Sequence, residues 1–273
     1  MTRYLELNHL LSGVTLYPYG QRPKCCEGDF FANTDPQGFC GFFSMGEIAR
    51  TLGETGCLTH WKSQGYEDVQ LSVSREGEGC HHLGVFTRVG GQLEWLLHLE
   101  VWLEYVEIAR PGVAYPAFCV DRLLLQRPGV KPEYDMPGQA WASSGLLRRF
   151  FGVIGHWAAR TGARIVTEIP EFFHTAYIFS RHFSYIDWEM EGIFRKVCRD
   201  LLVDKTPAGV SALSRDFENK HVTRNGGLYE WPTEMQVMAL EHGLAEKLRV
   251  PGEVLDDGEY LVHGFSGAEM GTF

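Results

Sequence analysis

The sequence predicts a mixed α/β fold in which helices flank a central sheet. Two patterns predict it. Apolar and polar residues alternate on both sides of Gly90-Gly91, which is typical of a β-hairpin. Further along, apolar runs at 117–125 and 163–169 enclose an amphipathic stretch at 146–158, which is the order of strand, helix and strand. A connection of this kind is right-handed and makes its two strands parallel.

The composition is that of a packed protein without an obvious polyanionic or membrane partner. Of the 273 residues, 44% are hydrophobic, and 25 Lys and Arg stand against 35 Asp and Glu. The net charge of -10 repels phosphate backbones, so no nucleic-acid partner is expected. No apolar run reaches the roughly 18 residues of a membrane span, and no signal peptide is recognisable. The odd number of cysteines, seven, fits reduced thiols, and we expect a cytoplasmic protein.

Turn-forming residues dominate the first part of the chain, which we interpret as an N-terminal elaboration, residues 1–67. Two helices are predicted within it, at 4–11 and at 44–52, the second with Ser44 as its N-cap. A strand at 69–73 then opens the core, which we place at 68–200.

The segment after the Gly-Gly turn is predicted to be a one-sided strand, because its apolar residues from Leu93 to Tyr105 fall mostly on odd positions. A helix is the alternative, since Trp95, Leu99 and Leu103 would share a helical face. The next strand, at 117–125, is expected to lie beside this hairpin.

The amphipathic stretch near 146–158 is the clearest helix of the sequence. Ser143 or Ser144 can cap its start, and Gly162 stands where a C-terminal glycine is expected. A strand at 163–169 and a helix at 171–182 follow, the helix with an inward stripe of Phe172, Ala176, Phe179 and Phe183.

The last third of the chain is predicted to hold a strand at 185–197, a polar stretch at 204–225 and a helix at 232–249. Thr233 and Gln236 have the spacing of a capping box for that helix. We interpret residues 201–273 as a C-terminal extension packed on the core.

The stretch 120–188 resembles the central part of the GNAT superfamily of acyl-CoA N-acyltransferases. The strand at 121–125, the long helix and the strand at 163–169 carry the resemblance, together with a loop of small residues between them. The family's loop reads Gln or Arg, two residues, Gly, one residue, then Gly or Ala, and Ala142 and Ser144 stand at the two Gly positions here. The resemblance implies a mostly antiparallel sheet flanked by helices.

The resemblance also implies an acyl-CoA or acetyl-CoA co-substrate and transfer of the acyl group to an amine. Backbone amides at a helix N-terminus would hold the pyrophosphate. The loop residues implied are Gln139, Ala140, Trp141, Ala142, Ser143, Ser144 and Gly145. The strand residues implied for the pantetheine arm are Leu124, Leu125 and Gln126.

Attack of an amine on a thioester needs a base and an acid. Glu168, Glu171 and His174 are the candidate bases, although a solvated surface role is the alternative for each. The resemblance implies a tyrosine acid in the following helix, where Tyr177 is the nearest phenol, with Tyr185 as another.

A different class of function is a non-catalytic protein that keeps this fold as a binding or assembly module. Its extensions would then form a homo-oligomer interface. A metal site is not predicted, because the cysteines and histidines do not show the paired spacing of metal ligands. The residues concerned are Cys25, Cys26, Cys40, Cys57, Cys80, His81 and His82.

Overall fold

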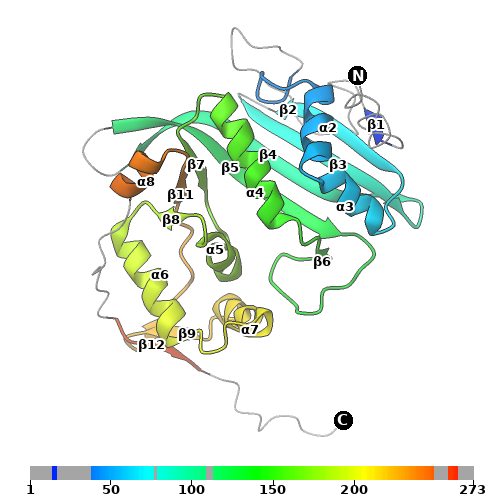
Figure 1. Ribbon diagram of the computed structural model, residues 1–273. Coiled ribbons are helices and arrows are strands. Elements are labelled where there is room, and N and C mark those ends of the chain that lie inside the picture. Colours follow the sequence, from blue (N-terminus) through cyan, green and yellow to red (C-terminus); the bar gives the residue numbers. More distant parts are fainter. Residues whose placement is uncertain (1–13, 17–37, 77–78, 109–112, 249–257, 264–273) are drawn as a thin grey trace, which may run out of the picture. The chain divides into compact units, whose positions relative to one another are not determined.

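The computed structural model describes residues 14–16, 38–76, 79–108, 113–248 and 258–263 (Figure 1). The helix expected at 4–11 lies outside the described residues. The chain divides into two compact units. The first unit comprises Met1–Pro132, Ala140–Glu168 and Ala239–Leu244, and the second comprises Glu133–Gln139, Ile169–Met238 and Ala245–Phe273. The boundaries expected near residues 67 and 200 do not coincide with this division.

The first unit is built on a mixed, mostly antiparallel sheet. Its strands lie in the order β1, β2, β3, β4, β5 and β7, with β6 paired to β5. Neighbours from β2 to β5 are antiparallel, whereas β1 is parallel to β2 and β7 is parallel to β5. The fold class is confirmed at this level. The strands are β1 (Val14–Leu16), β2 (Val69–Glu76), β3 (Cys80–Val89), β4 (Gln92–Ile108), β5 (Val113–Arg127), β6 (Ala142–Ser143) and β7 (Ile165–Glu168).

The predicted hairpin is the β3–β4 pair, which excludes the helical alternative for β4. Val89 pairs with Gln92 across a two-residue turn, in which Gly90 and Gly91 have φ of 58° and 84°. Glycine suits both positions, because a residue with a Cβ is strained there. Between Val85 and Phe86 the register shifts by a β-bulge.

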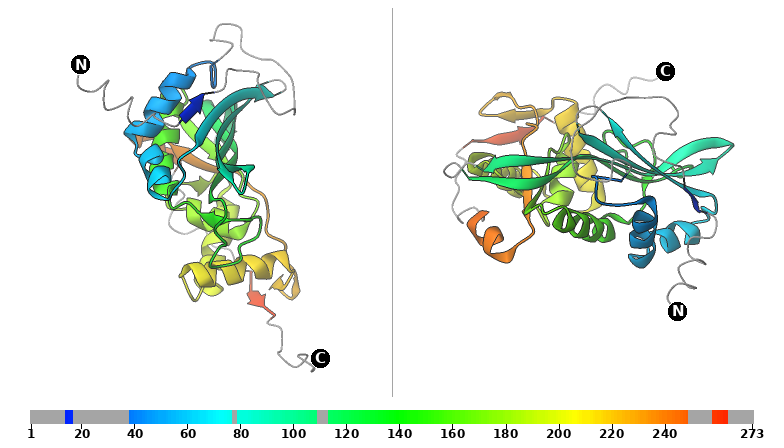
Figure 2. Two further views of the ribbon diagram at one scale, coloured as in Figure 1. Left: turned by 90° about the vertical axis from the view of Figure 1, so that its right-hand side faces the viewer. Right: turned by 90° about the horizontal axis from the view of Figure 1, so that it is seen from above.

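Helices α2 (Met45–Glu54), α3 (Cys57–Ser63) and α4 (Leu147–Arg160) cover one face of this sheet (Figure 2). Ser44 caps α2 as predicted: its Oγ accepts from the Glu47 amide, and the Glu47 carboxylate accepts from the Ser44 amide at 3.0 Å. α3 was not predicted. Trp157 of α4 is fully buried and packs edge-on against Phe39, with ring centroids 5.6 Å apart.

The start of α4 differs from the prediction. Neither Ser143 nor Ser144 is its N-cap: Leu146 occupies that position and makes no side-chain capping bond. The reason is that Ser143 belongs to β6, and Gly145 (φ 75°) turns the chain between strand and helix. The helix ends as predicted before Gly162, which has φ 82°.

A distant segment completes the first unit. The amide of Leu240 donates to the carbonyl of Arg164 at 3.0 Å. The Arg164 guanidinium forms two parallel hydrogen bonds with the Glu241 carboxylate, at 2.9 and 2.7 Å. This bidentate geometry ties residues 239–244 to the chain just before β7.

The second unit has a core of aromatic side chains around Phe173, which contacts Phe194, Phe217 and Trp231. A three-stranded antiparallel sheet has the order β10, β9, β12, and β11 pairs with β8. Its elements are α5 (Phe173–Phe179), β8 (Ser184–Tyr185), α6 (Trp188–Asp200), α7 (Pro207–Glu218), β9 (Val222–Arg224), β10 (Gly227–Leu228), β11 (Gln236–Ala239), α8 (His242–Leu248) and β12 (Tyr260–Val262), where β11 and α8 cross a boundary between the units.

Several predictions for the last third are wrong. The strand expected at 185–197 is mainly α6, whose N-cap Asp187 accepts from the Glu189 amide at 2.8 Å. The polar stretch at 204–225 contains α7, with Thr206 as N-cap and Pro207 in its first turn. The helix expected at 232–249 is strand β11 followed by the short α8, because Gln236 pairs with Tyr185 instead of closing a capping box. α5 is shorter than expected, and Phe173 replaces Phe172 in its buried stripe.

Candidate active site

The first feature of the site is the position at which the pairing of β7 with β5 ends. The two strands pair from Ala117 with Ile165 to Val120 with Glu168, and β5 continues beside β4 to Gln126, where β6 joins it (Figure 1). Among the described residues, no strand pairs with this edge of β5 between Val120 and Gln126. The predicted parallel pairing is confirmed, and it ends at Glu168.

Backbone groups of β5 point out of this unpaired edge. The Leu125 carbonyl accepts from the Ser144 amide at 3.2 Å, so it faces away from β4. Alternate residues of a strand direct their backbone groups to the same edge, so those of Leu123 point there too. Of the other residues predicted to bind the pantetheine arm, Leu124 pairs with His98 of β4, and buried Gln126 donates its side-chain amide to the Trp95 carbonyl at 3.0 Å.

Glu168 occupies the end of the paired region and is buried. Burial raises the pKa of its carboxyl group to about 8. Its Oε1 has no hydrogen-bond partner among the described residues. A protonated carboxyl of this kind can exchange a proton near neutral pH, which an ordinary surface glutamate cannot.

The small-residue loop does not have the arrangement that the family resemblance implied. Its amides already have partners within the chain: Ala142 donates to the Val130 carbonyl at 2.9 Å, and Ser144 donates to Leu125. The amides of Gly145 and Leu146 donate to serine hydroxyls at 3.4 and 3.3 Å. In this structure these four amides therefore donate to groups of the chain itself.

The remaining loop residues have separate surroundings. Ser144 is buried, and its carbonyl oxygen lies 2.8 Å from His60 Nε2 of α3. Trp141 is half-buried, and Lys131 Nζ lies 5.3 Å from its ring centroid. Ala140 is exposed. Gln139 belongs to the second unit, where its amide donates to the Met136 carbonyl at 3.1 Å.

Two arginines, Arg148 and Arg149, are exposed in the first turn of α4, which contains no acidic residue. Cations are unfavourable there, because the helix dipole places partial positive charge at the N-terminus. Arg149 Nη1 donates to the Gly56 carbonyl at 3.5 Å, so one of the two guanidinium groups has a partner within the chain. The sequence shows Arg148-Arg149 a few residues after the loop, but the prediction of pyrophosphate binding rested on the small residues of the loop.

The other predicted catalytic residues belong to the second unit. His174 is buried, its Nδ1 lies 2.9 Å from Ser214 Oγ, and burial lowers its pKa to about 4, so the imidazole is neutral. Tyr177 packs beside Phe173 at 6.2 Å, Tyr185 is buried, and Glu171 is exposed. Because Glu168 lies in the first unit, the candidate site is confined to residues of that unit.

The class of protein that fold and site define is a mixed α/β protein with a large, mostly antiparallel sheet flanked by helices. No protein-family model matches the chain, and no curated protein is significantly similar to it. Among the described helices, none combines the length and the apolar character that crossing a bilayer requires.

Proposed function

We propose that the protein is an acyl-CoA-dependent acyltransferase that moves an acyl group to an amine, with Glu168 as the general base. The observation that carries the proposal is the open edge of β5 that begins at the Val120–Glu168 pair. It combines a backbone surface for an extended ligand with a titratable group at its end.

The open edge suits the pantetheine arm of coenzyme A. That arm contains two amide groups, which can hydrogen-bond to a strand edge in the manner of an added strand. The backbone groups of Leu123, and the amide of Leu125, supply donors and an acceptor on this edge. The thioester would then lie towards the β7 end, where Glu168 stands.

Glu168 suits the role of base because its raised pKa increases its proton affinity. A base works best when its pKa is near the working pH, and a value of about 8 meets that condition in mildly alkaline solution. The ionised carboxylate takes the proton of the attacking amine. The thiolate of coenzyme A leaves, and the acyl group becomes an amide.

We assign the binding of the coenzyme A phosphates to the start of α4 instead of the small-residue loop. The loop amides have internal partners, whereas Arg148 and Arg149 are exposed beside the helix N-terminus. Together they supply positive charge for the phosphates despite the net charge of the chain. The buried, unpaired thiols of Cys40, Cys57 and Cys119 are compatible with a reducing compartment, and we propose a cytoplasmic location.

A binding or assembly module without catalysis is the second candidate, and the internally bonded loop favours it. Thermal unfolding with acetyl-CoA and longer acyl-CoAs tests both, because a ligand of the native state raises apparent stability. Release of free thiol in the presence of simple amines then measures turnover. We expect the wild-type protein to show both a thermal shift and turnover. Glu168→Gln should abolish the turnover, and Glu171→Gln, at an exposed position, is the control.

Each result has one meaning. A shift without turnover in the wild-type protein would support the binding module. No shift at millimolar acyl-CoA would refute coenzyme A binding. Turnover that survives Glu168→Gln unchanged would remove Glu168 as the base.

A further inference from the structure

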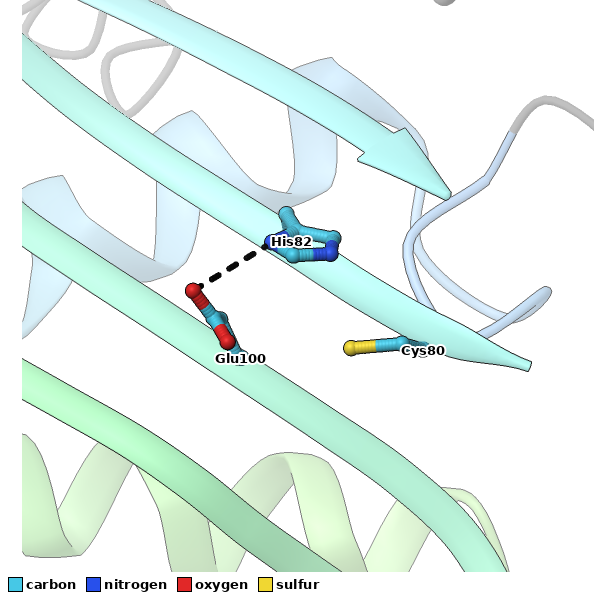
Figure 3. Close-up of side chains that lie close together, drawn as sticks. All are labelled: Cys80, His82 and Glu100. Atoms are coloured by element: carbon cyan, nitrogen blue, oxygen red, sulfur yellow. Dashed lines mark ion pairs between the residues drawn. The ribbon is translucent and has the colours of Figure 1, made fainter. Parts of the chain in front are cut away.

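Three side chains with metal-binding atoms meet on the β3–β4 hairpin of the first unit. Cys80 and His82 are two residues apart on β3, so they lie on the same face of the sheet. Glu100 of β4 is the direct cross-strand partner of His82. One sulfur, one imidazole nitrogen and one carboxylate oxygen of these residues all lie within 4.8 Å of one another (Figure 3).

The β-bulge creates this group. Counted back from the Gly90-Gly91 turn, a regular hairpin would place Leu99 opposite His82. The register shift between Val85 and Phe86 moves β4 by one residue and brings Glu100 there instead. The bulge therefore exchanges an apolar partner for a carboxylate and points it to the face that carries Cys80 and His82.

We propose that Cys80, His82 and Glu100 bind a Zn²⁺ ion. A thiolate, an imidazole and a carboxylate are ligands of this borderline-soft cation, and a small rearrangement of side chains brings them to bonding distance. With three protein ligands, the fourth position of a tetrahedral ion remains for water or a small ligand. The site is independent of the proposed acyl transfer.

The surroundings of Glu100 support the site. His98 Nε2 lies 3.0 Å from Glu100 Oε1, where it can orient the carboxylate as an outer partner. The His98 ring is itself held between Trp95, at 4.2 Å, and His82, at 6.0 Å. Arg122 Nε, 3.7 Å from the same oxygen, opposes a cation, but its side chain is 62% exposed and water screens its charge.

Metal binding is measured on the full chain by equilibrium dialysis against Zn²⁺ with elemental analysis. Absorption after Co²⁺ replacement adds a specific signal, because a thiolate ligand gives a charge-transfer band. We expect about one equivalent of Zn²⁺ that depends on these residues. Cys80→Ser should abolish the band, Glu100→Gln should weaken binding by more than about 100-fold, and His98→Gln by about 10- to 100-fold.

Two matched variants serve as controls. Cys198→Ser removes a thiol of α6, and Glu104→Gln removes a carboxylate of β4 outside the group, so both should bind like the wild type. Circular dichroism in the presence of a chelator checks that each variant folds. The proposal would be overturned if the wild-type protein did not bind near-stoichiometric Zn²⁺. It would also be overturned if Glu100→Gln folded and bound Zn²⁺ as tightly as the wild type, and this test does not require that Cys80→Ser folds.

Discussion

His82 lies opposite Glu100 in the β3–β4 ladder, one position further along β4 than the turn alone would give. The residue that makes the difference is Leu96, which stands between the partners of Phe86 and Val85 and is buried. A buried extra residue fixes the bulge, since moving it would expose its side chain to water. The pairing of His82 with Glu100 thus depends on a buried apolar residue that contacts neither side chain through the ladder pairing.

The buried carboxyl of Glu168 should make stability depend on pH. Its folded pKa is about 8 against 4.5 for an ordinary glutamate, so the folded state binds more protons between these values. Its stabilising contribution is complete below pH 4.5 and is lost as the pH rises to about 8. Glu168→Gln should remove this dependence of the free energy of unfolding on pH. The dependence amounts to up to several kcal/mol, because one pKa unit corresponds to about 1.4 kcal/mol.

Denaturant unfolding of Glu168→Gln at several pH values, beside the exposed control Glu171→Gln, measures this effect. A parallel stability profile for Glu168→Gln and the wild type would contradict the assignment of a raised pKa.

Replacement of Leu123 by proline tests the open edge of β5. Proline removes a backbone N–H that points away from β4, so the β4–β5 pairing should survive. Leu123→Ala keeps the N–H and is the matched control. We expect Leu123→Pro to lower the affinity for acyl-CoA by about 5-fold or more, corresponding to one hydrogen bond of about 1 kcal/mol.

Isothermal titration of both variants with acetyl-CoA gives the comparison. Equal affinity of folded Leu123→Pro and Leu123→Ala would show that the pantetheine arm does not use this edge.

The hairpin turn should resist substitution at Gly91. Alanine at its φ of 84° is strained by about 1–2 kcal/mol. Gly46, exposed in α2 with no atom within 4 Å of an added Cβ, is the opposite case, and Gly46→Ala should stabilise by about 0.4–1 kcal/mol. Urea denaturation of both variants gives the sign of the change in the free energy of unfolding for each substitution. A Gly91→Ala variant more stable than the wild type would contradict the turn geometry.

Trp157 should be a central support of the first unit. It is fully buried against Phe39, Phe43 and Phe150, so Trp157→Ala should cost about 3–5 kcal/mol. Trp102, 40% exposed on β4, is the control, and its replacement by alanine should cost less than half as much. Circular dichroism follows unfolding without relying on tryptophan fluorescence.

The sequence predicted elements whose signals are local. Ser44 and Glu47 form the expected capping box, Gly90-Gly91 forms the expected turn, and the parallel pairing of β5 with β7 follows from the strand–helix–strand order. Prediction from the sequence failed where pairing with distant residues decides the secondary structure. Gln236 belongs to a strand because Tyr185 pairs with it, although the local spacing favoured a helix.

The candidate sites were predictable only in part. Glu168 was recognised at the end of its strand, but its burial is a tertiary property. The loop amides were assigned to a ligand, whereas Val130 and Leu125 accept hydrogen bonds from two of them. The Cys80–His82–Glu100 group was not predicted because one of its members lies on another strand, and the register of that strand is set by a bulge without a clear local signal.

The pairing of Arg164 with Glu241 has a consequence for biosynthesis. The segment that completes the first unit is translated only after Ile169–Met238, which belong to the second unit. A nascent chain that has passed β7 therefore lacks two of the partners of Arg164, and the first unit reaches its final form only after residues 239–244 have been synthesised. Neither unit is formed by one continuous stretch of the chain.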